Sequence, residues 1–280
     1  MEIASLLTEM MPKVLDSIEF ETKRYLMGTL ATLVGLWFIV SHFIKGRKIR
    51  AASPRRRQLQ QIAMELKNSA KTVVVFAAMN TVLFNGPIAS MFQIYKGEAS
   101  TISGQIYFWL SVPLYIVLHD AYFYWTHRAM HHRSLYRYFH MTHHRSHNPT
   151  PFTAYNFAPL EAVVNFSFLP TAVLLIPIHN DAIYIVMTIM IFKNASSHAG
   201  YEIMPRSWAK LPVLGWLTTV THHDMHHERG SANFGFYFTW WDKWMGTEHA
   251  DYHERLERQL ARDMEMKAAR KTGQPPVAAE

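Results

Sequence analysis

Five apolar runs constrain the fold of this 280-residue chain more than any other feature. The first has the roughly 20 residues that a helix needs to cross a bilayer, whereas the last two are short enough to form a re-entrant hairpin. The alternation typical of strands is lacking and helix formers dominate. We therefore predict an all-α protein, with an integral membrane stem of about four or five membrane helices or re-entrant segments under a cytosolic histidine-rich helical cap. The runs are residues 25–44, 72–95, 104–118, 161–178 and 182–192.

Positive charge is concentrated directly after the first apolar run. The formal net charge is +7, and much of it lies in residues 45–57, KGRKIRAASPRRR. A basic segment beside an apolar run is typical of a cytoplasmic loop, so we predict no nucleic-acid partner. The first 20 residues include acidic side chains and do not have the pattern of a cleaved signal peptide.

The order of the runs predicts on which side of the membrane the histidines lie. If residues 45–57 are cytoplasmic, the second and third runs cross and return, which brings residues 119–160 to the cytoplasmic side. The segment 161–192 crosses and returns again, which brings His198 and the rest of the chain to that side. Every histidine cluster is therefore predicted on one membrane face.

Cysteine is absent, whereas histidine occurs 17 times. The lack of cysteine excludes disulfides, thiolate zinc sites, cysteine-ligated iron–sulfur clusters and a cysteine nucleophile. Imidazole and carboxylate groups remain as the available metal ligands.

The histidines recur in three boxes with helical spacing, one H-x3-H and two H-x2-H-H. Residues three and four apart share one face of a helix, so each box can direct its imidazoles to one side. A single zinc ion needs three or four ligands, whereas the boxes are sufficient for two ions that each keep an open position. Imidazole suits zinc, copper, iron and nickel, so the ligand type leaves the metal open. The boxes consist of His127 and His131, then His140, His143 and His144, then His223, His226 and His227.

Further histidines lie near these boxes. His198 stands alone between the second and third boxes, and His222 adjoins the third. His132 and His147 flank the first two boxes, and we expect them not to bind metal. Unligated histidines packed this closely would disfavour one another's protonation, so a pH-sensing cluster is the weaker explanation of the pattern.

At these boxes the sequence resembles the fatty acid hydroxylase and sterol desaturase superfamily of integral-membrane di-iron enzymes. The resemblance covers about residues 70–250 and includes a closing signature of the form N-[FY]-G, W-D and G-T after the third box. One departure is Ala158, at a position where many members carry a histidine. The matching segments are HDAYFYWTHRAMH (119–131), HMTHHRSHNPTPFTA (140–154), HHDMHH (222–227) and NFGFYFTWWDKWMGT (233–247).

The resemblance implies an oxidoreductase that hydroxylates or desaturates a lipid C–H bond with dioxygen as co-substrate and two iron ions as cofactor. It also implies three regions: an N-terminal membrane helix with a basic cytoplasmic linker (1–70), a catalytic membrane domain (71–250), and a charged cytoplasmic tail with a disordered end (251–280). Carried over residue by residue, the implied iron ligands are His127, His131, His140, His143, His144, His223, His226 and His227, with His198 and His222 as additions.

Several other residues are candidates to support the ligands. His119 ends a membrane helix in a histidine–aspartate pair, and we expect it to support the metal site or to bind metal weakly. Ligating histidines usually donate their second N–H to an oxygen, and the candidate carboxylates are Asp120, Glu161, Asp224 and Asp242. The aromatic run 234–241 either lines a lipid channel or forms an interfacial belt.

Two other classes of function remain open. A membrane-embedded zinc hydrolase would need a glutamate base as in H-E-x-x-H, and that motif is absent. A histidine-rich metal-binding or transport protein would carry its ligands within the spans, whereas these lie at span ends and in loops.

The partners that we predict are a lipid, the bilayer and a separate electron donor. The donor is a reductase, ferredoxin or cytochrome, since the chain lacks a cysteine-ligated cluster and the G-x-G-x-x-G motif. The substrate is a sterol, a fatty acyl chain or a related lipid. We place the active site on the cytoplasmic face of a multi-pass protein and favour a bacterial inner membrane over the endoplasmic reticulum.

Overall fold

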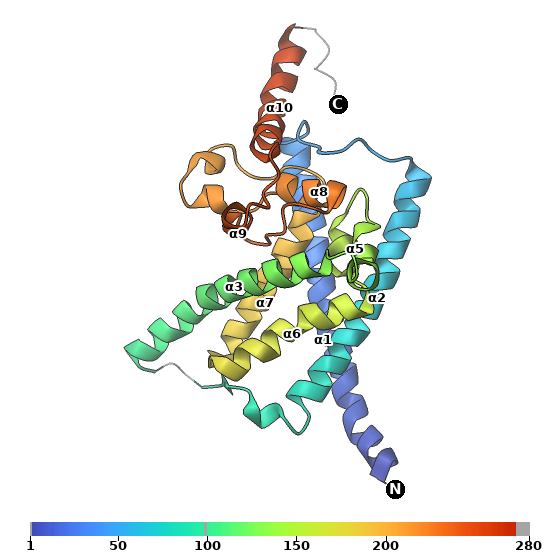
Figure 1. The fold of residues 1–280 in the computed structure, drawn as a ribbon, viewed down its shortest axis with the longest axis vertical. Coiled ribbons are helices and arrows are strands. Elements are labelled where there is room, and N and C mark those ends of the chain that lie inside the picture. Colours follow the sequence, from blue (N-terminus) through green and yellow to red (C-terminus); the bar gives the residue numbers. More distant parts are fainter. Residues whose placement is uncertain (1, 98–99, 273–280) are drawn as a thin grey trace.

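The computed structural model describes residues 2–97 and 100–272, and this part of the chain is mostly helical (Figure 1). The α-helices are α1 (Glu2–His42), α2 (Arg55–Phe84), α3 (Ile102–Met130), α4 (Tyr136–Phe139), α5 (Met141–His144), α6 (Pro159–Leu175), α7 (Asn180–Ser197), α8 (Val220–Arg229), α9 (Trp240–Trp244) and α10 (Tyr252–Thr272). Short 3-10 helices are η1 (Ala89–Met91), η2 (Pro151–Tyr155), η3 (Trp208–Lys210) and η4 (Leu214–Trp216), and the strands are β1 (Ile94–Tyr95) and β2 (Ile178–His179).

The long helices α1, α2, α3, α6 and α7 form the body of the molecule, and the short helices α8 and α9 lie over one end of it (Figure 1). Helix α1 packs against α2 and α7, and α6 packs against α2 and α3. At the other end, β1 and β2 pair in parallel, with Ile94 opposite Ile178, and join the α2–α3 connection to the α6–α7 turn. The described residues are therefore mostly helical, as predicted, with this two-residue ladder and the isolated bridges Lys48–Tyr201 and Leu217–Phe238 as exceptions.

Two of the described helices are long and apolar enough to cross a membrane. They are α1, over Thr8–His42, and α3, and the apolar helix α6 is shorter. Large apolar side chains point outward on α1 and α3. Among them, the exposed fraction is 70% for Trp37 of α1 and 65% for Trp109 of α3. Such surfaces suit lipid contact. The predicted count of four or five membrane segments is not confirmed.

The apolar run 72–95 is not one continuous segment. Its helix ends at Phe84, and an Asn-Gly-Pro sequence follows. A Cβ atom at Gly86 would overlap the carbonyl oxygen of Val82, so this tight turn requires glycine. The polar segment 55–71 before the run forms the first half of the same helix, α2.

Helix α2 holds in place the segment that follows the second histidine box. The buried carboxylate of Glu65 accepts hydrogen bonds from Ser146, Thr150 and Thr153 at 2.5–2.9 Å. Tyr25 of α1 stacks on Tyr155 with ring centroids 5.0 Å apart. These contacts fix residues 146–155 between α1 and α2.

The predicted disordered end lies outside the described residues, apart from Thr272, where α10 ends. The division of the chain into three regions stays a prediction.

Candidate metal centre

Nine histidines form two separate groups of side chains in the interior. Within each group the candidate ligand nitrogens all lie within 4.8 Å of one another, and each group could hold a metal ion. Group A consists of His127, His131, His140, His144 and His226, and group B consists of His143, His198, His223 and His227. All eight boxed histidines and His198 are thus brought together.

The two H-x2-H-H boxes each contribute to both groups. In the second box, His140 and His144 belong to group A and His143 to group B. In the third box the division is reversed, because His223 and His227 belong to group B and His226 to group A. Residues four apart lie on one face of a helix and the intervening histidine is rotated away, so two such boxes facing each other form two sites.

The other group histidines lie at the ends of helices or on a short helix. His127 lies in the last turn of α3 and His131 is its C-cap residue, whereas His198 is the C-cap residue of α7. The third box lies on α8, whose N-terminus is capped by the Thr219 side chain accepting from the backbone N–H of His222 at 3.0 Å.

The imidazole nitrogens are oriented as metal ligands are. The Nδ1 atoms of His127, His198 and His226 lie 2.7–2.9 Å from the carbonyl oxygens of Phe234, Asn194 and Ala232. A carbonyl oxygen only accepts, so each Nδ1 carries the proton and each Nε2 presents a lone pair. This pattern of a second N–H donated to an oxygen is usual for metal-bound histidine.

The Nε2 lone pairs then face one another. The Nε2 atom of His127 lies 2.9 Å from that of His140 in group A, and the Nε2 atom of His198 lies 2.9 Å from that of His223 and 3.3 Å from that of His227 in group B. Nitrogens bound about 2.1 Å from one ion are about 3.0 to 3.4 Å apart at octahedral or tetrahedral angles. A cation relieves the repulsion of converging lone pairs, so both groups fit a metal ion.

The ligand candidates are neutral at ordinary pH. Burial lowers the pKa of both His198 and His226 to about 4. Burial and the neighbouring imidazoles lower the pKa of His143 and His223 well below the usual value. Neutral imidazole is the form that binds metal, so the groups are preset for ligation.

Other predicted residues lie outside the two groups. His222 is buried beside Asp242, with Nε2 3.4 Å from the carboxylate. His132 and His147 are exposed at the surface. His119 is buried but belongs to neither group.

The four candidate carboxylates have different roles, and one touches a group histidine. The Oε1 atom of Glu161 lies 2.6 Å from Nδ1 of His140. Asp120 instead accepts from the backbone of Tyr237 and the indole of Trp240, both at 2.7 Å, and Asp224 pairs with Arg50 at 2.8 Å.

Asp242 organises the loop that follows the third box. Its carboxylate accepts from the backbone N–H groups of Phe234 and Gly235, each at 2.8 Å, and from the hydroxyl of Thr247 at 2.7 Å. A Cβ atom at Gly235 would lie 2.8 Å from that carboxylate, so only glycine fits the turn. The loop thereby presents the carbonyl of Phe234 to His127. This network explains the N-F-G, W-D and G-T pattern.

Sequence reasoning missed three residues that hold the site. Glu65 fixes the segment after the second box, as described above. Glu202 is fully buried and accepts from the backbone N–H and hydroxyl of Thr221 at the start of α8. Arg50 anchors the basic segment 45–57 onto α8 through Asp224. Acidic and basic residues at these positions give no signal along the chain, because their partners are distant in sequence.

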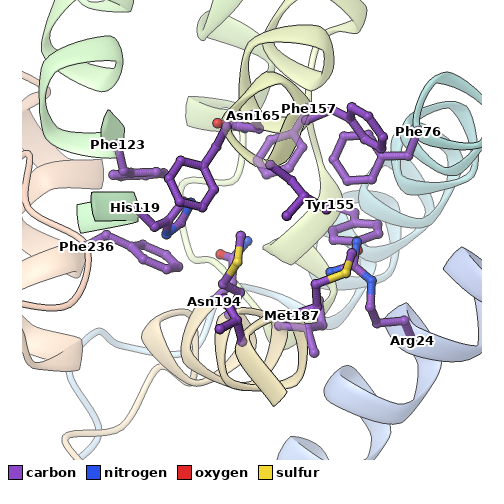
Figure 2. A pocket seen from close by; sticks show the side chains of 16 residues that line it. Arg24, Phe76, His119, Phe123, Tyr155, Phe157, Asn165, Met187, Asn194 and Phe236 are labelled. Carbon is purple, nitrogen blue, oxygen red and sulfur yellow. The ribbon is translucent and has the colours of Figure 1, made fainter. Parts of the chain in front are cut away.

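An apolar cavity lies beside both groups. Figure 2 shows the side chains that line it. Two of its aromatic side chains touch the histidines: the ring of Phe123 lies 4.9 Å from that of His127, and the ring of Phe157 lies 5.6 Å from that of His143. The volume open to the centres of water-sized molecules in the cavity is about 80 Å³. Phe236 of the aromatic run 234–241 also lines it.

Comparison with known proteins agrees with this arrangement. The fatty acid hydroxylase family matches residues 112–247. The C-4 methylsterol oxidase of Schizosaccharomyces pombe is 31% identical over 54% of this chain and 50% of its own length. A Delta(7)-sterol 5(6)-desaturase of Gibberella zeae is 27% identical over 69% and 58%, and methylsterol monooxygenase 1 of Rattus norvegicus is 30% identical over 51% and 47%. The matched stretch spans about half the length of these relatives, and no solved structure matches the chain. The nine histidines of the two groups all lie inside the region that is similar to the fatty acid hydroxylase family.

Proposed function

We propose that this chain is a membrane oxidoreductase that uses dioxygen to hydroxylate or desaturate a C–H bond of a lipid. The observation that carries the proposal is the position of two histidine groups directly behind Phe123 and Phe157, which line an apolar cavity. The similarity of residues 112–247 to the fatty acid hydroxylase family supports iron as the metal in both groups. Two iron ions, when bound, supply the activation of dioxygen that attack on a C–H bond requires.

The chain itself supplies positioning and exclusion of water. The carbonyl oxygens of Phe234, Asn194 and Ala232 keep the histidine Nδ1 protons in place, and Glu161 holds the Nδ1 atom of His140. The aromatic rings of the cavity shield the reacting carbon from solvent. Whether an alcohol or an alkene forms depends on how the cavity places the substrate carbon.

We place the substrate among sterols, fatty acyl chains and related lipids. The names of the relatives, two of them methylsterol oxidases and one a sterol desaturase, support a sterol. An apolar cavity lined by rings such as Phe76, Phe166 and Phe168 suits a flat polycyclic lipid as well as a chain.

The electrons come, in this proposal, from a separate protein that docks on the cap. Arg133, Arg137 and Arg145 are exposed on or beside α4 and α5, which carry the second box. Such a surface favours an acidic partner, although at physiological salt its attraction reaches only about 8 Å.

The proposal includes the membrane location. The long helices α1 and α3 cross the bilayer, and the basic segment 45–57 places the histidine groups on the cytoplasmic face. We favour a bacterial inner membrane.

The test is lipid mass spectrometry of a host with and without the protein, in air and under anaerobic growth. We expect a lipid that gains one oxygen or loses two hydrogens, only in air. The His131→Ala variant should abolish this product, and His132→Ala, which alters an exposed histidine outside both groups, should not. A product that forms without oxygen from zinc-loaded protein would instead indicate a hydrolase.

A further inference from the structure

His119 is a buried histidine that the two metal groups do not use. It is 5% exposed, and its Nδ1 atom has no hydrogen-bond partner among the described residues. It nevertheless lines the apolar cavity that borders both groups. Figure 2 shows it on one side of this cavity, with Phe123 and Phe236, while Arg24 lies on the other side.

Among the described residues, the neighbours of His119 leave its Nδ1 atom without a hydrogen-bond partner. Aromatic rings pack around it, with that of Phe168 at 4.7 Å, Phe236 at 5.4 Å and Tyr237 at 5.5 Å between centroids. A neutral imidazole always has one nitrogen that donates and one that accepts. Buried polar groups are normally paired, so a bound molecule can supply the partner that Nδ1 of His119 lacks among the described residues.

The position of His119 relative to the metal groups is fixed by α3. It lies eight residues before His127 on the same helix, which corresponds to roughly 12 Å along the axis. The ring of Phe123 lies between them, 6.0 Å from His119 and 4.9 Å from His127. A molecule that touches His119 therefore extends along the cavity toward group A.

A second polar group lines the same cavity nearer to group B. The side-chain amide of Asn194 donates to the carbonyl oxygen of Ala154 at 2.7 Å, while its backbone carbonyl faces His198. His119 on α3 and Asn194 on α7 are thus two of the few polar residues in a lining that is mostly apolar and that also includes Arg24 and Asn165. A few polar groups in an apolar pocket orient a ligand rather than supply most of its affinity.

We infer that His119 is a positioning residue that hydrogen-bonds an oxygen atom of the lipid substrate. The substrate class is a lipid with a hydroxyl or carbonyl oxygen several carbon–carbon bonds away from the carbon that is oxidised. His119 holds the oxygen atom of the substrate, and the metal groups lie near the carbon that is oxidised. The distance between His119 and the metal groups therefore selects which carbon is attacked. This inference rests on the proposed function, whereas its test measures binding and not oxidation.

The test is equilibrium binding of radiolabelled probes to the metal-free protein in detergent. Two matched pairs are used: cholesterol with its 3-deoxy analogue cholest-5-ene, and 1-hexadecanol with hexadecane. The wild type should bind the oxygenated member at least tenfold more tightly in at least one pair. The His119→Phe variant keeps a ring without nitrogens and should reduce that ratio to near one, whereas His119→Gln restores a polar atom and should recover part of it.

The result separates the inference from the proposed function, because no metal and no turnover are involved. Equal binding of both members in both pairs by the wild type would overturn the inference, as would a preference that His119→Phe leaves unchanged. His253→Phe, at an exposed histidine on α10, is the control for a histidine-to-phenylalanine change. A chain that oxidises lipids but shows no preference would keep its proposed function and lose this role of His119.

Discussion

Replacing Glu161 by glutamine should weaken one metal site and leave the other intact. The Glu161 carboxylate is 1% exposed and its Oε1 atom lies 2.6 Å from Nδ1 of His140, a member of group A. Glutamine keeps an oxygen for this contact but removes the negative charge that makes the imidazole a better ligand. Loss of such a partner typically lowers metal affinity about 10- to 100-fold, which corresponds to about 1.4 to 2.8 kcal/mol.

The assay is chelator competition on reconstituted protein, with metal content measured by mass spectrometry. In Glu161→Gln, about one of the two ions should be lost at a chelator concentration 10- to 100-fold lower than in the wild type. Glu228→Gln is the matched control, because Glu228 adjoins the third box but pairs with Arg255 at the surface. Equal weakening of both ions, or unchanged affinity, would refute the assignment of Glu161 to group A.

Three further predictions follow from single features. Burial holds the pKa of His226 at about 4, below the 6.5 of the unfolded chain, so the unfolded state binds more protons between these values. The free energy of unfolding of the metal-free protein should therefore fall as the pH is lowered from 6.5 to 4, with His226 contributing at most about 1.4 kcal/mol per pH unit. Denaturant titrations measure this change. A rise in stability over this range would contradict a lowered pKa of His226. Gly235→Ala should destabilise the protein by more than about 2 kcal/mol in thermal unfolding, because its Cβ would lie 2.5 Å from the carbonyl oxygen of Phe238. Gly35→Ala is the control and should be nearly neutral, because a Cβ atom there meets open space. Met187 lines both the apolar cavity beside the histidine groups and a second cavity. Met187→Ala should therefore join the two cavities and shift the products toward longer lipids. An unchanged product profile would contradict a shared wall.

The clustering of the histidines could be predicted from the sequence because their spacing on helices is local information. All eight boxed histidines and His198 meet in the two groups. The spacing did not show which histidine belongs to which group. His140 and His143 are only three residues apart, yet they face different groups, and that depends on where α8 packs against α5.

The supporting residues were harder to identify, since their partners are distant in sequence. Asp120, Asp224 and Glu161 are all acidic and near histidines, but only Glu161 contacts a group member. Glu65 and Arg50 gave no signal because each holds a segment more than 80 residues away. The helix boundaries showed a similar limit: hydropathy extended the second run to residue 95, whereas the turn at Gly86 ends the helix at Phe84.

The most direct test of the central claim is the number of iron ions bound per chain after anaerobic reconstitution, in the wild type and in two double variants. We predict about two ions in the wild type. The variant His131→Ala/His144→Ala, which alters only group A, and the variant His198→Ala/His223→Ala, which alters only group B, should each retain about one. A single ion in the wild type, or the loss of both ions in either variant, would contradict two separate histidine sites.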